Sequence, residues 1–341
     1  MSLPPPPLHL MASASAITLL ALGCAKFPSI GWSVSCVVKA CWPIDVSLAT
    51  GMQQWAWTQW EAPVASRQLP PDKVRELAIG EVPEDRSQPF IVRGLLNSSS
   101  SPMIGADYSW LMRPPLGELV VDYFTNASVK DGITPNARAP LADVVRRIVA
   151  GGTEKIGTEM IFRRFPHLLA ELKMAELVAP LIGSASHIDA QWLGSTLTVP
   201  VFMATGKPQA RTDLHCEPIA NLVMMLGGSK TWTLVDPSQS FYLKPTLSPD
   251  GRAYFVSSVD PTVDPAESLA HVRRWVVETG PGDVLWVPTW TWHRVDYHDG
   301  ETALSASLFH FRAGMAAANN ALFTGLVVPN MIKEVVGWKT Q

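Results

Sequence analysis

The sequence predicts a mainly β fold with flanking α-helices, and three observations support this prediction. Residues 221–226 (Asn-Leu-Val-Met-Met-Leu) form an unbroken, largely apolar run with the length of a buried strand. The turn 227–229 (Gly-Gly-Ser) tolerates positive φ, and a second strand is expected over 230–235 before Asp236-Pro237 ends it. The chain also has 29 prolines and 13 tryptophans, which suit a loop-rich β fold packed by aromatic side chains.

Further elements are expected on both sides of this hairpin. A short apolar strand is predicted over 284–287, between the turn Pro281-Gly282-Asp283 and Pro288. Residues 141–150 and 168–178 carry apolar side chains at helical spacing, so these segments are expected to be helices packed outside the sheet. Residues 266–275 are expected to form a further helix or an insertion.

His215, Glu217 and His293 are the candidate metal ligands. Residues i and i+2 of a strand face the same side, so His215 and Glu217 can face one cavity, and His293 can join them from a distant strand. Two imidazoles and one carboxylate are the ligand set of non-haem Fe(II) oxygenases. A His-x-Glu pair alone also arises by chance, and a histidine between tryptophans can equally be a core residue bonded to backbone.

Lys230 alternates with Trp232 and Leu234, which places a cation on a largely apolar strand face. If the ammonium is buried there, it needs an anionic partner. The alternative is a lysine at the mouth of the hairpin with its ammonium in water.

Three sequence blocks resemble the Jumonji-C, or cupin-like, Fe(II)- and 2-oxoglutarate-dependent oxygenases. The likeness is closest to the branch of the asparaginyl hydroxylase that inhibits hypoxia-inducible factor. The blocks are Thr212-Asp213-Leu214-His215-Cys216-Glu217 followed by Asn221, residues 227–237, and residues 282–288 with Trp292-His293. The resemblance implies a double-stranded β-helix, that is, a jelly-roll or cupin-like core. It extends more weakly upstream, through a first strand at 89–95 and a helical stretch at 116–124.

The resemblance implies the catalytic ligand set: His215, Glu217 and His293 would hold Fe(II). Glu217 stands where this branch usually has aspartate, although other Jumonji-C enzymes use glutamate. The implied activity is that of a dioxygenase. It would couple the conversion of 2-oxoglutarate and O2 to succinate and carbon dioxide with hydroxylation, or demethylation, of a macromolecule.

The resemblance also implies the residues that bind 2-oxoglutarate. Lys230 and Thr212 would bind its distal carboxylate, and Asn221 would line the same pocket. Ser307, which shares a strand face with Ser305, lies near the position where this branch has an asparagine. No residue is identified for the pocket tyrosine that some members use. Two alternatives remain open, a metal-dependent cupin enzyme that does not use 2-oxoglutarate and a non-catalytic cupin-like binding module.

The predicted domain organisation has four parts. Residues 1–50 form a leader or targeting segment outside the core, residues 51–88 an arm, residues 89–315 the oxygenase domain, and residues 316–341 a C-terminal extension. Residues 1–44 have no acidic side chain, and residues 11–25 are apolar and rich in small side chains. The leader is interpreted as a cleaved targeting peptide, an anchor or a misplaced start. Three of the four cysteines precede residue 45, so the domain needs no internal disulfide.

Charge and composition restrict the partners. The net charge is −3 and no basic run is present, so nucleic acid is not indicated. A protein or peptide substrate is expected, membrane contact is expected only through residues 11–25, and a homodimer is compatible with the sequence. The resemblance implies a location in the cytoplasm or nucleus, whereas the leader is compatible with an organelle or the secretory route.

Overall fold

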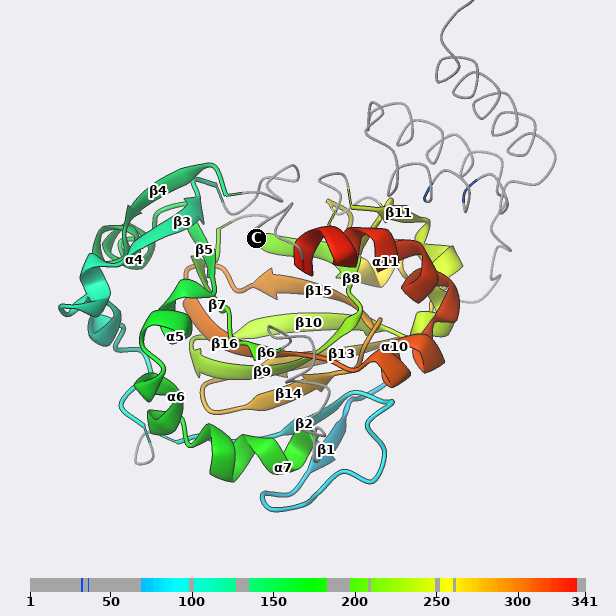
Figure 1. Ribbon diagram of the computed structural model, residues 1–341, viewed down its shortest axis with the longest axis horizontal. Helices are drawn as coiled ribbons and strands as arrows, with labels where there is room; N and C mark the ends of the chain where they lie inside the picture. Colours follow the sequence, from blue (N-terminus) through cyan, green and yellow to red (C-terminus); the bar gives the residue numbers. More distant parts are fainter. Residues whose placement is uncertain are drawn as a thin grey trace, which may run out of the picture.

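The structure is a computed structural model that describes Trp32, Cys36 and residues 69–97, 101–126, 135–182, 197–207, 210–248, 252–259 and 262–335. Two β-sheets dominate this part of the chain (Figure 1). The larger sheet has the strand order β1 (Arg75–Leu77), β2 (Phe90–Val92), β14 (Val284–Val287), β9 (Ile219–Gly227), β16 (Thr302–Phe311), β7 (Val201–Thr205), β5 (Lys155–Thr158), β3 (Val120–Phe124) and β4 (Ala137–Pro140), with β6 (Leu197–Thr198) paired to β16. The smaller sheet has the order β11 (Pro245–Leu247), β12 (Phe255–Ser257), β8 (Arg211–Cys216), β15 (Trp292–Tyr297), β10 (Lys230–Val235) and β13 (Arg274–Thr279).

The chain crosses repeatedly from one sheet to the other. Strands β8, β10, β13 and β15 lie in the smaller sheet, while β9, β14 and β16, which alternate with them along the chain, lie in the larger sheet. Neighbouring strands in this region pair antiparallel, as β9 does with both β14 and β16. Two antiparallel sheets connected in this way form a jelly roll, or double-stranded β-helix. The predicted mainly β fold is therefore confirmed.

Apolar side chains from both sheets fill the space between them. Val223 and Met225 of β9 pack in one cluster with Leu234 of β10 and Val295 of β15, and all four are buried. Because side chains alternate along a strand, this cluster identifies the inward face of each sheet. On β15 the inward residues are His293, Val295 and Tyr297, and on β10 they include Lys230.

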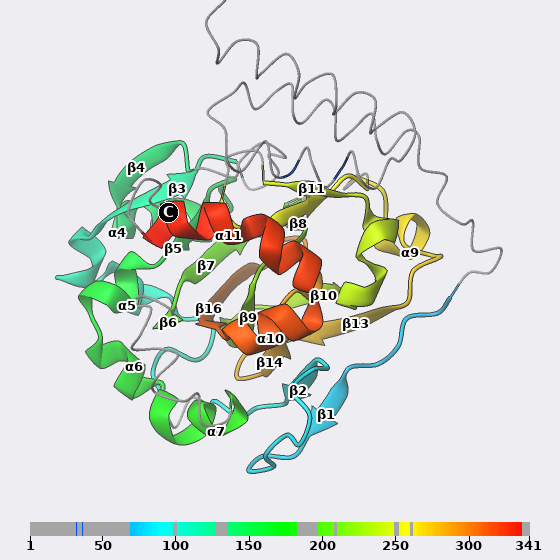
Figure 2. The same ribbon diagram turned by 45° about the vertical axis from the view of Figure 1, so that its right-hand side comes forward.

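The outward face of the smaller sheet is covered by the C-terminal helices α10 (Ala313–Asn319) and α11 (Ala321–Val335) (Figure 2). Phe323 of α11 stacks on Phe255 of β12, with ring centroids 4.1 Å apart. Trp32 and Cys36 join this cluster in helical backbone, and both are buried. This position differs from the prediction that residues 1–50 lie outside the core; the rest of that segment lies outside the described residues.

The helices beside the larger sheet agree only in part with the sequence predictions. The helix predicted at 141–150 is α4 (Leu141–Val149), whose apolar side is buried. The segment predicted as one helix at 168–178 is divided into α6 (His167–Glu171) and a π-helical turn at Met174–Val178, between α5 (Met160–Arg164) and α7 (Ala179–Ile182). Within the described residues no helix is long and apolar enough to cross a membrane.

The helix predicted at 116–124 is wrong, and of the two alternatives for residues 266–275 the long helix is not formed. The stretch 116–124 is helical only at Leu116–Glu118 and continues as strand β3, since its backbone pairs with β4 and β5. The segment 266–275 contains only the short helix α9 (Pro265–Ser268) before β13 begins, because β13 pairs with β10 along its whole length. At 116–124, sheet pairing with distant residues therefore decides the backbone conformation.

Candidate metal centre and anion site

His215, Glu217 and His293 meet between the two sheets. Each offers one ligand atom, and these atoms all lie within 4.8 Å of one another. His215 is on β8 and is the register partner of His293 on β15, while Glu217 directly follows the end of β8. His215 Nε2 lies 3.8 Å from Glu217 Oε1. The three residues predicted from the sequence are therefore together, in an arrangement that could hold a metal ion.

Backbone carbonyls hold both imidazoles in the same way. His215 Nδ1 lies 2.7 Å from the carbonyl oxygen of Asp213, and His293 Nδ1 lies 3.0 Å from that of Thr291. A carbonyl only accepts, so Nδ1 carries the proton in each ring and donates it. Each Nε2 then presents its lone pair to the cluster, which is the arrangement that fixes a histidine as a metal ligand.

Burial favours the uncharged forms of the two imidazoles. It lowers the pKa of His215 and that of His293 to about 4, so both rings are neutral at pH 7. Burial also raises the pKa of Glu217, an effect that the electrostatic interactions with His293 and Arg252 oppose. A divalent cation between these three groups would stabilise the carboxylate form and use both lone pairs.

A β-bulge places Thr212 on the same side of the sheet as His215. His293 pairs with His215 and Val295 pairs with Thr212, so two steps along β15 correspond to three along β8. Without the extra residue, alternation would turn Thr212 away from the interior. The bulge therefore allows one strand to supply both a metal ligand and a hydroxyl group further along the interior.

Lys230 is buried, and its contacts cross from the smaller sheet to the larger one. Its Nζ donates to Ser305 Oγ on β16 at 2.6 Å and lies 4.8 Å from the ring centroid of Tyr297 on β15. Burial is the main cause that lowers the pKa of Lys230 well below its usual value, and the charge of Lys155 adds to it. The alternative of a solvated lysine at the hairpin mouth is therefore wrong.

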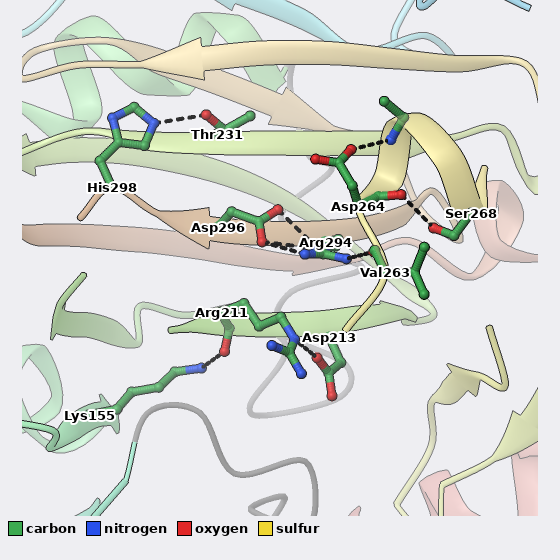
Figure 3. A network of polar contacts seen from close by, with 11 residues as sticks. Lys155, Arg211, Asp213, Thr231, Val263, Asp264, Ser268, Arg294, Asp296 and His298 are labelled. Atoms are coloured by element: carbon green, nitrogen blue, oxygen red, sulfur yellow. Dashed lines mark hydrogen bonds and ion pairs between the residues drawn. The ribbon is translucent and has the colours of Figure 1, made fainter. Parts of the chain in front are cut away.

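Lys155 also belongs to this region, although no sequence pattern indicates it. It is on β5 in the larger sheet, and its Nζ donates to Thr212 Oγ1 on β8 at 2.6 Å. It also approaches the carbonyl oxygen of Arg211, and Figure 3 shows it reaching β8 beside the Arg211–Asp213 ion pair. Its Nζ is 5.9 Å from the same Tyr297 ring. Burial lowers the pKa of Lys155 to about 8, partly opposed by the charge of Asp213.

The other predicted residues line the inward face of the larger sheet. Asn221 of β9 pairs with Val287 of β14, and its buried side-chain oxygen has no hydrogen-bond partner in the described part of the chain. Ser307 pairs with Val223 and is buried, but the hydroxyl that bonds Lys230 is that of Ser305. Both serines therefore face the interior, and Ser305 is the member of the pair that bonds Lys230.

Arg252 and Tyr254 lie beside the metal ligands and were also missed. The ring of Tyr254 is edge-on to that of His215, with centroids 6.2 Å apart, and the guanidinium of Arg252 lies 5.4 Å from the Tyr254 ring centroid. Both residues precede β12, whose Val256 pairs with His215. Nothing in their own sequence pattern indicates this position, because it depends on the pairing of β12 with β8.

Comparisons with known proteins agree with this architecture. The model of the cupin-like domain family matches residues 84–311. Over 101 residues the chain is 33% identical to HSPB1-associated protein 1 of Rattus norvegicus and to that of Bos taurus, and 32% identical to that of Homo sapiens. The aligned segment covers 28% of this chain and 21% of each of these relatives, so the match spans about a fifth of their length.

Proposed function

The chain belongs to the cupin-like domain family, and we propose that it is an Fe(II)- and 2-oxoglutarate-dependent dioxygenase acting on a protein side chain. One observation carries the proposal. The His215–Glu217–His293 cluster and the buried ammonium of Lys230 face the same interior and are joined by strand β15. A metal centre alone would not require a buried cation further along that strand.

The metal ligands suit Fe(II) with open positions. Two neutral imidazoles and one carboxylate provide three ligands, which is the facial arrangement of non-haem iron oxygenases. When bound together, Fe(II) and 2-oxoglutarate supply oxidative decarboxylation that yields succinate and carbon dioxide and inserts an oxygen atom of O2 into a substrate. The carbonyls of Asp213 and Thr291 keep both imidazoles in the ligating tautomer throughout.

The region around Lys230 suits the other end of 2-oxoglutarate. Lys230 pairs in register with Tyr297, four residues along β15 from His293, which is about 13 Å of extended strand. A C5 dicarboxylate chelated at the metal and a lysine side chain reaching toward it can together span this separation. The ammonium of Lys230 and the hydroxyl of Ser305 would then bind the distal carboxylate. The amide of Asn221, whose oxygen is unpartnered, is available on the same inward face.

The proposed substrate is a polypeptide. The resemblance to the asparaginyl-hydroxylase branch supports side-chain hydroxylation, and demethylation is the other reaction of Jumonji-C enzymes. The relatives named HSPB1-associated protein 1 are named for an association with a protein, which also supports a protein partner. Arg252 and Tyr254 beside the ligands are positioned to contact whatever substrate approaches the metal.

Succinate release tests this function. Full-length protein would be supplied with Fe(II), ascorbate and 2-oxoglutarate, with and without candidate peptides, and succinate would be measured. We expect release from wild-type protein, and none from His215→Ala or Lys230→Ala. Bound metal without succinate release under any condition would favour a cupin enzyme that does not use 2-oxoglutarate. Protein that binds neither metal nor 2-oxoglutarate would favour a non-catalytic binding module.

A further inference from the structure

We infer that Lys155 and Lys230 together form a two-lysine clamp on the distal carboxylate of the co-substrate. The inference rests on the proposed function and assigns to Lys155 a binding role that the sequence pattern did not indicate. Lys155 comes from β5, which lies outside the three sequence blocks that carry the metal ligands and Lys230.

Each lysine bonds a hydroxyl group of the opposite sheet, and both lysines lie near the ring of Tyr297. Lys230 extends from the smaller sheet to Ser305 of the larger sheet, and Lys155 extends from the larger sheet to Thr212 of the smaller one. Both hydrogen bonds are 2.6 Å long. The two ammonium nitrogens lie 4.8 Å and 5.9 Å from the centroid of Tyr297. Both lysine nitrogens therefore lie within 6 Å of the Tyr297 ring centroid, one from each sheet.

Within the described part of the chain, the lysines and hydroxyls here have more hydrogen-bond donors than acceptors in contact with them. An ammonium only donates, so Ser305 and Thr212 accept from the lysines and each retains its own hydroxyl proton for donation. The remaining contacts of the ammoniums are long, 3.5 Å from Lys230 to the carbonyl of Phe202 and 3.4 Å from Lys155 to that of Arg211. Two ammoniums and two hydroxyls with donors to spare fit an oxyanion with several lone pairs.

The charges at this locus are also unbalanced. Among the described residues no carboxylate lies within ion-pair distance of either ammonium, and the charge of Lys155 disfavours the protonated form of Lys230. The carboxylate of Asp213, whose charge favours the protonated form of Lys155, is already paired with Arg211 at 2.6 Å. A carboxylate bound between the lysines would stabilise the protonated form of both, which burial disfavours.

The clamp predicts selectivity for a co-substrate with a distal carboxylate. 2-Oxopentanoate has the same chain length as 2-oxoglutarate and the same metal-chelating end, but it has a methyl group in place of the distal carboxylate. Lys155 should therefore contribute to the binding of 2-oxoglutarate and contribute nothing to that of 2-oxopentanoate. A residue that merely supported the fold would affect both ligands equally.

Anaerobic calorimetry on Mn(II)-loaded full-length protein tests this role without depending on turnover. We expect Lys155→Met to weaken 2-oxoglutarate binding by about tenfold or more, as the loss of a charge-assisted hydrogen bond does, and to leave 2-oxopentanoate binding within about twofold. Lys155→Arg should retain most of the affinity because it keeps the cation. Lys73→Met is the matched control, since Lys73 is exposed and distant in the fold from Lys155.

Three results would contradict these inferences in distinguishable ways. Unchanged 2-oxoglutarate affinity in Lys155→Met, with wild-type binding intact, removes the clamp and leaves the proposed function. An equal loss for both ligands assigns Lys155 a structural role instead. Failure of wild-type protein to bind 2-oxoglutarate removes the proposed function itself. If Lys155→Met does not fold by circular dichroism, Lys155→Gln, which keeps N–H donors for Thr212, is measured by the same criteria.

Discussion

His215 and His293 are direct register partners on β8 and β15, and their ring centroids lie 4.2 Å apart. Two imidazoles this close could not both be protonated without repulsion, and burial keeps both neutral by lowering the pKa of each to about 4. The pairing of β8 with β15 thus directs the Nε2 lone pairs of both histidines toward the same candidate metal position. Glu217, just beyond the end of β8, supplies the anionic ligand.

Replacing His215 by alanine should therefore abolish tight metal binding. We expect apparent Fe(II) or Mn(II) affinity to fall by at least about 100-fold, because the loss of a ligand should exceed the 10- to 100-fold effect of losing its outer partners. Mass spectrometry of the metal that remains bound after dialysis measures this loss directly. His298→Ala is the matched control, since His298 is hydrogen-bonded to Ser229 and Thr231, away from the cluster. Retained metal in His215→Ala would show that the ligand assignment is wrong.

Part of the candidate metal cluster could be predicted from the sequence, because the placement of His215 and Glu217 follows from a local rule, whereas that of His293 depends on the pairing of β15 with β8. Strand alternation puts His215 and Glu217 on one side, and the residue types restrict the chemistry. The position of Thr212 required more, since alternation turns it away from His215 and only the bulge in β8 reverses this. Bulges arise from pairing across the sheet, which no single strand encodes.

Lys155 could not be predicted for a related reason. It begins a short strand of alternating burial, where a lysine is usually solvated, and its partner Thr212 is 57 residues away. Only the pairing of β5 with β7 brings it to the interior. The wrong helix at 116–124 has the same origin, because β3 exists through its pairing with β4 and β5. The local sequence pattern therefore predicted the placement of residues that lie close together in the sequence. It did not predict placements that depend on pairing between distant strands.

Ser305 and Ser307 can be distinguished by mutation, although both are buried on the inward face of β16. Ser305→Ala removes the hydroxyl that accepts from Lys230, so we expect 2-oxoglutarate affinity to fall by about two- to tenfold, the effect of one hydrogen bond. Ser307→Ala should change it by less than about twofold. Calorimetry on the Mn(II)-loaded proteins gives the comparison, and a larger effect at Ser307 would contradict the assignment of Ser305.

The affinity for 2-oxoglutarate should decrease above pH 8. The pKa of Lys155 is lowered from 10.5 to about 8, so its positive charge is present below that pH and is lost as the pH rises through it. Among the described groups that face Lys155, none gains a positive charge over this pH range. Burial raises the pKa of Tyr297, so the phenol stays neutral, Asp213 is paired with Arg211, and the pKa of Lys230 is itself lowered.

If binding requires one proton on Lys155, the affinity falls by at most about tenfold for each pH unit above the pKa of Lys155. Dissociation constants measured between pH 6.5 and 9.5 on Mn(II)-loaded protein would show the dependence, and the 2-oxopentanoate series serves as the reference for metal chelation. Lys155→Arg keeps its charge over this range and should have the shallower curve. Equal slopes for wild-type protein and Lys155→Arg would show that Lys155 is not the group responsible.

Trp32 should contribute strongly to the stability of the jelly roll, although it lies within the segment expected to be a leader. Its indole Nε1 donates to the carbonyl of Pro245 at 2.7 Å, and its ring lies about 6 Å from those of Phe255 and Phe323. Truncation to alanine leaves a cavity in this cluster, so Trp32→Ala should lower the free energy of unfolding by about 3–5 kcal/mol, and Trp32→Phe by less. Chemical denaturation of the full-length proteins measures the difference. The exposed Ile79→Ala is the control, and equal stability of Trp32→Ala and that control would show that the segment around Trp32 does not pack on the domain.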